Sequence, residues 1–534
     1  MTNRQLSRRD LLRLVSLTAG GAVLASTARA MTGTRSPFRH PAVMGSGMTS
    51  PGGMMPGRFP GVIDPPPGSA FTDPARLDLA RPAPGVVEAH LTVGFTPVRI
   101  AGERASLLTY NGLFPGPTIA VGNAETLRLH LTNGLRPTTG ANLLGFPRNV
   151  TNIHTHGWHV SPQDPMDNVM RHIGPGETWT YVYDLTKLTP GALAWYHPHV
   201  HGLVAEQLWS GLAGALVVDD ATAALGRYET HLLVLKDITL RNGQPDPYAG
   251  VMDFVRGKEG ETVTVNGLVN PVLTVRPGQV QRWRVLNAST ARFYKLSLEG
   301  HRLHVIGTDG GLLDKPYRQA AVLLAPGERL DILVKASSTA GSYKLLSLPY
   351  DRAGMMGMDG GMMSGSRGQQ VTLLTTIVAG TPASESLPGV VNRGARRLRM
   401  DLGGLPKRRF VLGMHMGRGS INGHDFDVDP HAIQSRLFDS ASTHEVWTIV
   451  NPTAMDHPWH QHVNHAQILT MSGGDAAYAR LYTGAPAWKD VVIVPRGGSV
   501  TQLVRVRDWV GMTMFHCHIV EHEDIGMLGM WYIR

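Results

Sequence analysis

The sequence predicts an all-β protein that consists of three Greek-key β-sandwich domains. Glycine (62 residues) and proline (36 residues) are abundant, as expected where many short strands are joined by turns. At 534 residues the chain is too long for one hydrophobic core, and a domain size of roughly 150 residues favours three domains. The third observation is a sequence pattern that occurs three times.

Each copy of this pattern combines an Asn-Gly turn, an alternating strand that ends in asparagine, and a later glycine turn. The Asn-Gly pairs are Asn111-Gly112, Asn266-Gly267 and Asn422-Gly423, and the strands end at Asn133, Asn287 and Asn451. The later turns contain Gly176, Gly327 and Gly497. Asn-Gly favours a tight turn and period-two alternation favours a strand with one buried face, so each copy predicts the same sandwich. We place the domains at 85–221, 222–392 and 393–534.

The N-terminus has the features of an export signal. Arg8 and Arg9 precede an apolar stretch that begins at Leu11, and Ala28-Arg29-Ala30 offers a small-residue cleavage site. Paired arginines at this place are typical of the twin-arginine route. An ordinary secretory leader or a membrane anchor is the alternative, although the stretch is short for an anchor. We predict a signal peptide at 1–30, a Met/Gly/Pro-rich segment at 31–84, and a mature protein in the periplasm or cell exterior without a membrane span.

The composition is that of a globular protein, with 42% hydrophobic and 17% charged residues. The formal charge of +9 falls to about +5 when the five arginines and one aspartate of the predicted signal are left out. No basic run is interleaved with aromatic residues, so no nucleic-acid partner is expected. The single cysteine, Cys517, excludes an intramolecular disulfide.

Ten histidines and the cysteine are gathered in four short segments. These are His154-Thr155-His156, His197-Pro198-His199, His457-Pro458-Trp459-His460-Gln461-His462, and His516-Cys517-His518 with His522. In a strand, residues two apart project to the same face, so each His-x-His pair can direct two imidazoles into one cavity. A lone histidine is more often structural, but repeated pairs are not explained in that way. The middle copy lacks such pairs, so we expect it to be a spacer between outer domains that pack face to face.

The ligand types indicate copper rather than zinc. A closed structural zinc site takes four ligands, and the ligand-type residues here are too many for one such site. Cys517, with His522 and Met527 after it, resembles a blue-copper loop, in which a Cys-His-His set has a weak axial methionine. The second histidine of this set is predicted to be His457.

Together, the four segments resemble the signature segments of the multicopper oxidase family, of the bacterial three-domain laccase or cuprous oxidase type. The resemblance covers essentially all of the mature chain and implies cupredoxin-like domains, four copper ions, and one-electron oxidation of a donor coupled to reduction of O₂ to water. By motif position, it implies that type 1 copper is bound by His457, Cys517, His522 and Met527. It assigns type 2 copper to His154 and His460, and the type 3 pair to His156, His197, His199, His462, His516 and His518.

Two carboxylates are candidates for proton relay. Asp167 and Glu523 resemble the aspartate and glutamate near the trinuclear site of the family, and carboxylates near a polycationic cluster are suited to this task. Each is otherwise a solvated acidic side chain or a helix cap.

Methionines near the middle of the chain bear on the electron donor. Met355, Met356, Met358, Met362 and Met363 lie in a glycine-rich tract at 351–368, and Met455 lies two residues before His457. Thioethers select Cu(I), so this tract resembles the methionine-rich segments of cuprous oxidases. We expect a monomer that oxidises Cu(I), phenols or both, in copper tolerance. The alternatives are a laccase acting mainly on phenols or aromatic amines, and a non-catalytic copper-binding protein of the envelope.

Overall fold

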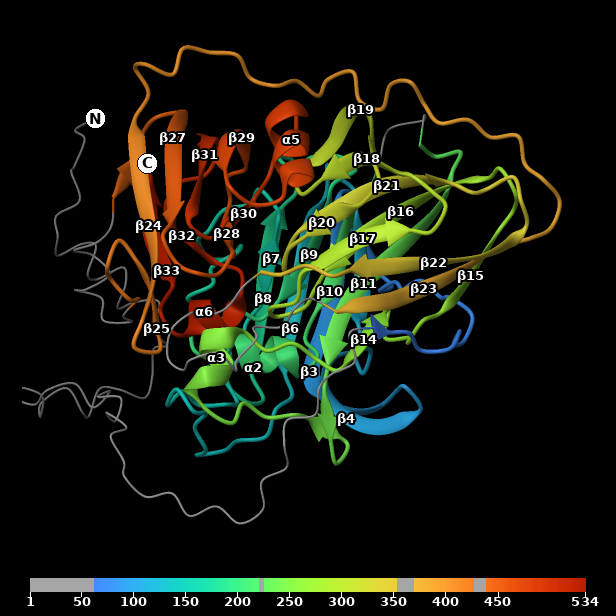
Figure 1. Ribbon diagram of the computed structural model, residues 1–534. Helices are drawn as coiled ribbons and strands as arrows, with labels where there is room; N and C mark the ends of the chain where they lie inside the picture. The colour runs from blue at the N-terminus through green and yellow to red at the C-terminus, as the bar shows by residue number, and fades with distance from the viewer. Residues whose placement is uncertain (1–61, 220–224, 353–368, 427–437) are drawn as a thin grey trace, which may run out of the picture.

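The computed structural model describes residues 62–219, 225–352, 369–426 and 438–534, and consists of three two-layered β-sandwiches that pack around a common centre (Figure 1). The all-β Greek-key prediction is confirmed for these residues, and helices are few and short. The exact domain boundaries stay a prediction.

The first sandwich pairs a five-stranded with a four-stranded sheet. The larger sheet contains β2 (Ala80–Ala83), β3 (Val86–Ile100), β6 (Thr126–Asn133) and β8 (Thr178–Asp184) in this order, with β4 (Glu103–Tyr110) paired to β3. The smaller sheet has the order β5 (Gly116–Val121), β10 (Gly214–Val218), β9 (Leu193–His197), β7 (His154–His156). Helix α2 (Val204–Trp209) connects β9 to β10.

The second sandwich pairs two six-stranded sheets. One has the order β14 (Thr262–Val265), β11 (Glu229–Ile238), β16 (Val280–Asn287), β21 (Arg329–Lys335), β18 (Leu303–Thr308), β19 (Gly311–Gln319). The other has the order β1 (Val62–Ile63), β23 (Gln370–Val378), β22 (Gly341–Leu348), β17 (Tyr294–Leu298), β20 (Val322–Leu324), with β15 (Val272–Val275) on β23. A hairpin of β12 (Leu240–Arg241) and β13 (Gln244–Pro245) precedes helix α3 (Val251–Arg256).

The third sandwich pairs two five-stranded sheets. One has the order β25 (Arg418–Ile421), β24 (Lys407–His415), β27 (His444–Asn451), β31 (Gly498–Arg505), β29 (Ala466–Ser472). The other has the order β26 (Asp439–Ser440), β33 (Leu528–Ile533), β32 (Gly511–Cys517), β28 (His457–Gln461), β30 (Val491–Val494). Helices α5 (Ala476–Gly484) and α6 (Val520–Asp524) lie between strands of this unit, and no helix of the described residues is long and apolar enough to cross a membrane.

The repeated asparagines have the same role in each sandwich. Asn111, Asn266 and Asn422 have φ between 53° and 56°, the left-handed conformation that an Asn-Gly hairpin turn requires. At the end of the following strand, the side-chain amide of Asn133 donates to the carbonyls of Asn149 and Ile173, both at 2.8 Å. Asn287 and Asn451 make the equivalent pairs of bonds in the other two units. The three predicted turns and strand ends are therefore confirmed.

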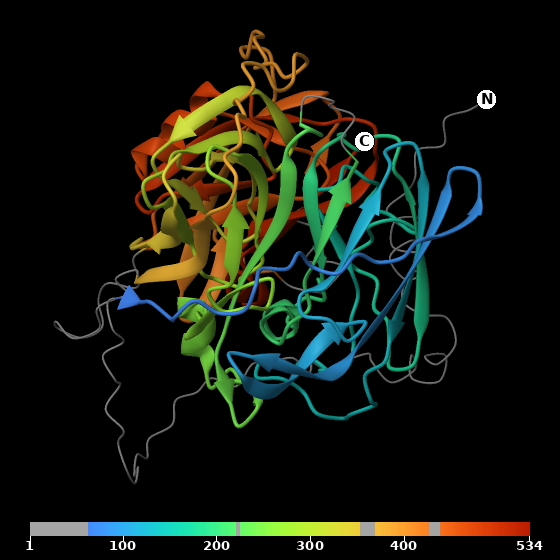
Figure 2. The same cartoon turned by 90° about the vertical axis from the view of Figure 1, so that its right-hand side faces the viewer.

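The first described residues join two of the sandwiches. β1 pairs with β23 of the second sandwich, and the backbone N–H of Leu77 donates to the carbonyl of Thr118 in the first. In Figure 2 this blue stretch crosses the molecule from one unit to the other.

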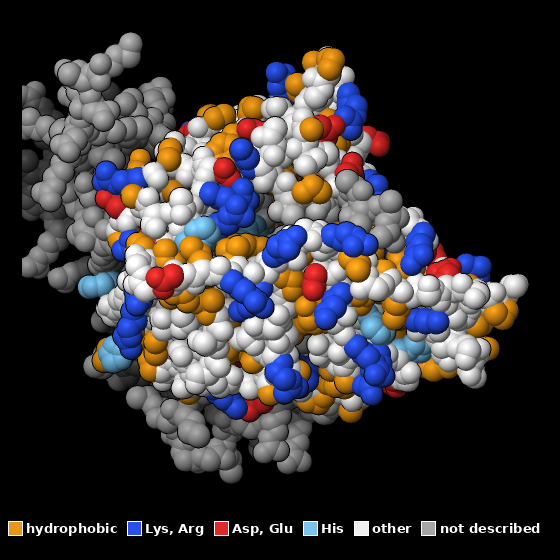
Figure 3. Space-filling model, turned by 90° about the horizontal axis from the view of Figure 1, so that it is seen from above, with side chains coloured by type: hydrophobic (Ala, Val, Ile, Leu, Met, Phe, Trp, Pro, Cys, Tyr) orange, Lys and Arg blue, Asp and Glu red, His pale blue; other side chains and the backbone are white. Residues whose placement is uncertain are grey.

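All three sandwiches meet in one apolar cluster. Trp195 of the first unit, Leu286 of the second and Val520 of the third are fully buried members of it. This packing brings β7 and β9 close to β28 and β32, although more than 250 residues separate them in the sequence. On the outer face seen in Figure 3, lysine and arginine side chains are scattered over the surface rather than gathered in one run.

Candidate metal centre

The cysteine lies in a small cluster formed within the third sandwich. β28 begins at His457, β32 ends at Cys517 and α6 carries His522. Cys517 Sγ is 3.4 Å from His457 Nδ1 and 3.6 Å from His522 Nδ1, and the two nitrogens are 3.2 Å apart. The structure thus brings together the three residues that the sequence assigns to type 1 copper. Met527, the fourth, is fully buried, and its carbonyl accepts a bond of 3.1 Å from the N–H of Cys517.

The outer nitrogens of both imidazoles are occupied. His457 Nε2 lies 2.8 Å from Thr453 Oγ1, and His522 Nε2 lies 3.1 Å from the carbonyl oxygen of Val255 in α3. A carbonyl only accepts, so His522 carries its proton on Nε2 and keeps the Nδ1 lone pair towards Cys517. Burial lowers the pKa of His522 to about 3 and raises the pKa of the Cys517 thiol. Two neutral imidazoles beside a thiol that ionises only with a cation are a donor set that fits copper.

Eight further histidines form a second, larger cluster between the first and third sandwiches. The first unit supplies His154 and His156 in β7, His197 at the end of β9, and His199. The third supplies His460 in β28, His462, His516 in β32, and His518. Antiparallel pairing sets His154 opposite His197 and His460 opposite His516. None of the eight is more than 3% exposed.

The assignment from the sequence divides six of these histidines into two groups of three, although the donor atoms of His154, His460 and His462 also lie within 4.8 Å of one another. His516 Nε2 lies 3.2 Å from both His199 Nε2 and His462 Nε2. In the other group, the ring of His518 lies 4.8 Å from that of His156 and 5.6 Å from that of His197. Each group takes ligands from both outer sandwiches. The remaining two rings, those of His154 and His460, lie 5.8 Å apart.

Five of the inward nitrogens have no hydrogen-bond partner. They are the Nε2 atoms of His154, His156, His197, His460 and His518, and all are buried. A buried polar atom without a partner costs free energy unless a bound cation or water satisfies it. Burial and the neighbouring rings also lower the pKa of His156, His197, His460 and His518, which keeps their lone pairs free. The cluster therefore fits several copper ions better than an empty polar core.

The two candidate relay carboxylates both touch this cluster. Asp167 Oδ2 lies 2.7 Å from His154 Nδ1, and its other oxygen accepts from the N–H of Thr155 at 2.8 Å. Glu523 is fully buried, with its oxygens 3.5 Å from His199 Nδ1 and 3.2 Å from His516 Nδ1. Burial, together with the nearby Asp524, raises the pKa of Glu523 well above its usual range. Asp167 is placed to orient one ring, and Glu523 lies between two of them.

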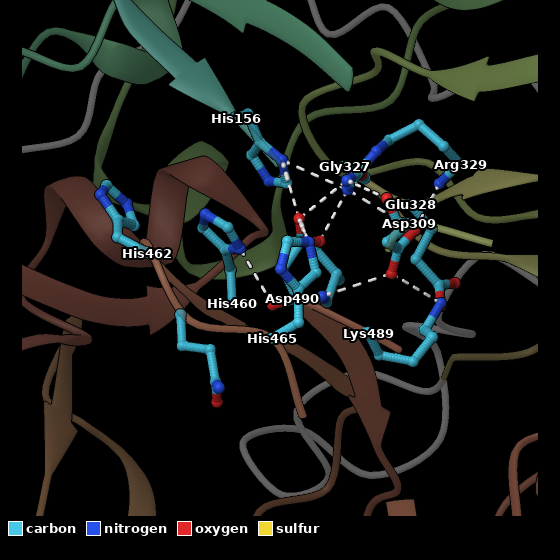
Figure 4. Close-up of polar contacts among 12 residues, drawn as sticks. His156, Asp309, Gly327, Glu328, Arg329, His460, His462, His465, Lys489 and Asp490 are labelled. Atoms are coloured by element: carbon cyan, nitrogen blue, oxygen red, sulfur yellow. Dashed lines mark hydrogen bonds and ion pairs between the residues drawn. The ribbon is translucent and has the colours of Figure 1, made fainter. Parts of the chain in front are cut away.

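A buried ionic network borders the cluster on the side of the second sandwich (Figure 4). Arg329 of β21 donates to both carboxylate oxygens of Asp490, at 2.6 and 2.7 Å, and lies 3.3 Å from His156 Nδ1. The backbone carbonyl of Asp490 accepts from His460 Nδ1 at 3.0 Å. Gly157 must lack a side chain, since a Cβ there would lie 2.1 Å from Arg329 Nη2. The middle unit thus contributes a side chain to the surroundings of the histidines, which the sequence does not reveal.

The predicted Cu(I) residues are only partly described. Met355, Met356, Met358, Met362 and Met363 lie outside the described residues. Met455 is 8% exposed, and its Sδ accepts from Arg352 Nη1 at 3.5 Å. Arg352 is the last described residue in the first part of the tract at 351–368, and its carbonyl accepts from the N–H of Asp456, the neighbour of His457.

Comparison with known proteins gives consistent matches. Sequence profiles described as multicopper oxidase match residues 92–223, 195–357 and 400–534. A laccase from Bacillus subtilis is 28% identical over 78% of this chain and 88% of its own length. The cell division protein FtsP from Yersinia pestis is 30% identical over 73% of this chain and 77% of its own length. The solved structure of a multicopper oxidase from Campylobacter jejuni, described as a metallo-oxidase, has a TM-score of 0.73 and 26% identity, and the match covers 88% of this chain and 96% of that one.

The profile matches together span most of the chain, and the structural match extends over all three sandwiches. They agree with the donor sets of the two clusters, which fit copper. The chain belongs to the multicopper oxidase family and is a copper-dependent oxidoreductase that uses dioxygen.

Proposed function

We propose that this oxidase binds four copper ions and passes electrons one at a time from Cu(I), and also from phenolic donors, to O₂, which is reduced to water. The single type 1 ion is assigned to His457, Cys517 and His522, with Met527 axial. The type 2 ion is assigned to His154 and His460, and the type 3 ions to the two groups of three histidines. The eight buried imidazoles of the larger cluster support more than one ion there, because a square-planar or tetrahedral copper ion takes only about four of them.

The bound copper ions supply one-electron redox chemistry, and the protein supplies the path and the protons. His516 and His518 flank Cys517, so a covalent route connects the cysteine cluster to both type 3 groups. Asp167 holds the Nδ1 proton of His154 and leaves its Nε2 free as a ligand. Glu523, whose pKa is raised by burial, is placed to relay the protons that reduction of O₂ consumes.

The proposal of a small electron donor rests on the burial of the cysteine cluster. His457 and His522 are fully buried, and Val255 of α3 occupies the outer nitrogen of His522. A phenol ring therefore has no direct contact with either imidazole, whereas a Cu(I) ion passed along thioethers needs little room. The bond from Arg352 to Met455 anchors the start of the methionine tract beside the cluster. The description of the Campylobacter jejuni relative as a metallo-oxidase agrees with a metal donor.

The experiment compares oxygen consumption with Cu(I) and with a phenol, before and after deletion of residues 354–364. Loss of Cu(I) oxidation with a gain in phenol oxidation is expected if the tract is both a copper port and a lid. A second variant changes Met355, Met356, Met358, Met362 and Met363 to leucine, which keeps the bulk and removes the thioethers. This variant should lose Cu(I) oxidation without the gain in phenol oxidation. Unchanged Cu(I) oxidation in both variants would show that the methionine tract is not a port for copper.

The same experiment also tests two alternative functions. The laccase relative favours phenols as the main donor, which predicts that both variants keep full phenol oxidation and that Cu(I) is a poor substrate of the unaltered enzyme. The relative named as a cell division protein favours the second alternative, a non-catalytic copper-binding protein of the envelope. In that case the protein would bind copper but consume no oxygen with either donor.

We further propose a role in copper tolerance, export of the folded monomer through the twin-arginine route, and the domain division at 85–221, 222–392 and 393–534. The proposed signal at 1–30 lies outside the described residues. Replacing Arg8 and Arg9 by lysine should retain the protein in the cytoplasm, as fractionation would show.

A further inference from the structure

A second group of metal-ligand side chains lies on the five-stranded sheet of the first sandwich. Glu88 and His90 belong to β3 and His130 to β6, and one ligand atom of each lies within 4.8 Å of the others. β3 and β6 are parallel neighbours, with His90 opposite His130. Since residues two apart share a face, all three side chains project from the same side of the sheet.

This side of the sheet faces outward. The alternate residues Val87, Ala89 and Leu129 are at most 1% exposed and belong to the core of the sandwich. His90, in contrast, is exposed, and Glu88 and His130 are partly exposed. An ion can therefore reach the group from solvent, and the group has no residue in common with the histidine cluster.

The two imidazoles lie side by side on this face. Their rings stack with centroids 4.5 Å apart and planes inclined by 13°. His130 Nδ1 lies 2.8 Å from Thr180 Oγ1, and with its proton directed to this hydroxyl the ring keeps a free lone pair on Nε2. Burial and the neighbouring His90 lower the pKa of His130. Glu88 also pairs with Arg128 at 3.2 Å, but the arginine side chain is 47% exposed and such a pair is weak.

We propose that Glu88, His90 and His130 form a surface site for a divalent transition-metal ion, with Cu²⁺ bound most tightly. Two imidazoles and a carboxylate suit Cu²⁺, Ni²⁺ and Zn²⁺, and the usual order of stability places Cu²⁺ first. Because the rings stack, His90 must turn so that one nitrogen of each ring points to the ion, at the distance of about 2 Å that such ions require. The site depends neither on the electron donor nor on the coppers of the oxidase centre.

The test titrates the copper-loaded, tag-free enzyme with Cu²⁺ and with Zn²⁺ in a calorimeter, after weakly bound metal has been removed. The unaltered enzyme should bind one further ion of either metal. His90→Ala and His130→Ala should each weaken this binding roughly tenfold or more. Both substitutions are near the surface, so the thermal midpoint and the rate of donor oxidation should stay unchanged.

His444→Ala is the matched control. His444 is partly exposed and lies 3.2 Å from a threonine hydroxyl, that of Thr443, but it belongs to no group of three ligand residues in the described chain. This substitution should leave the binding of the further ion unchanged. The proposal is overturned if the unaltered enzyme binds no further ion, if neither variant weakens the binding, or if only one of the two does so.

Discussion

The outer sandwiches bury histidines where the middle sandwich buries ion pairs. β28 and β32 direct neutral imidazoles inward, whereas β16 and β21 bury Arg282, Arg329 and Asp331. Arg282 pairs with Asp331 inside its own sheet, at 2.9 Å, while Arg329 reaches Asp490 in the third sandwich. A buried charge is tolerated only when it is paired, so each guanidinium fixes the position of its carboxylate. The outer units thus leave donor atoms for a cation, and the middle unit uses charge to hold those donors in place.

Removing the cysteine should have the largest effect and tests the outer side of this comparison. Cys517→Ser replaces the soft ligand by a hydroxyl that binds copper poorly. We expect donor oxidation to fall to background, the intense visible absorption of copper thiolate to disappear, and the copper content to fall by about one ion per chain. The histidine cluster should keep its copper, as its paramagnetic resonance signal would show. Substantial activity in this variant would contradict the assignment of the electron entry site.

Glu523→Gln keeps the shape of the side chain and removes its exchangeable carboxyl proton. We expect turnover with a fast donor to fall roughly a hundredfold, within the range of general acid catalysis. Glu521→Gln is the control, because Glu521 is an equally buried carboxyl of α6 that contacts Tyr248 and the N–H of Lys258 instead of the histidines. Equal rates in the two variants would remove Glu523 from the proton path.

Arg329→Lys and Arg282→Lys test whether the two buried arginines of the middle sandwich have different roles. Each keeps a positive charge and loses a two-pronged contact with a carboxylate, so both should lower the thermal midpoint. Only Arg329→Lys should also weaken copper retention against a chelator, by roughly tenfold, because Arg329 and Asp490 position the rings of His156 and His460. If both variants hold copper equally well, the network has a structural role only.

Replacing Lys236 should have the smallest effect on stability. It tests whether this buried lysine loses its charge in the middle sandwich. It is 2% exposed, its ammonium donates to the carbonyl of Leu208 at 2.6 Å, and burial lowers its pKa to about 8 from the usual 10.5. Between these two values the unfolded chain binds more protons, so stability from this residue rises with pH there, by at most about 1.4 kcal/mol per pH unit. The unaltered protein should therefore gain stability relative to Lys236→Met between pH 8 and pH 10. Parallel curves of thermal midpoint against pH would show that Lys236 does not titrate in this way.

The strand pattern was predictable where only one face of a strand is buried. β6 alternates as expected, with Leu127, Leu129 and Leu131 buried, and the Asn-Gly turns lie where local chemistry places them. β16 has the same alternation in sequence but is buried on both faces, because Arg284 on its polar side donates to the carbonyl of Gly191 in the first sandwich. A contact between units cannot be recognised from the period of a single strand.

The histidines and the cysteine of both clusters could be found in the sequence, because His-x-His pairs and the His-Cys-His segment are local patterns. The residues that surround them could not. Arg329 lies 161 positions from Asp490, and Val255 lies 267 positions from His522, so no spacing connects them. In the sequence nothing distinguishes Arg329 or Val255 from other residues, and each acquires its role only when the sandwiches pack.

The three-fold repeat, the four histidine segments and their division between the outer copies follow from the sequence alone. Turn preference, strand period and ligand type are properties of short stretches of chain, and they do not depend on what lies opposite. Only the packing of the chain showed that the four segments meet in two clusters, that Glu523 lies between two of the histidines, and that Arg329 of the middle sandwich borders them. These relations depend on contacts between distant segments, and only the packing of the three units creates them.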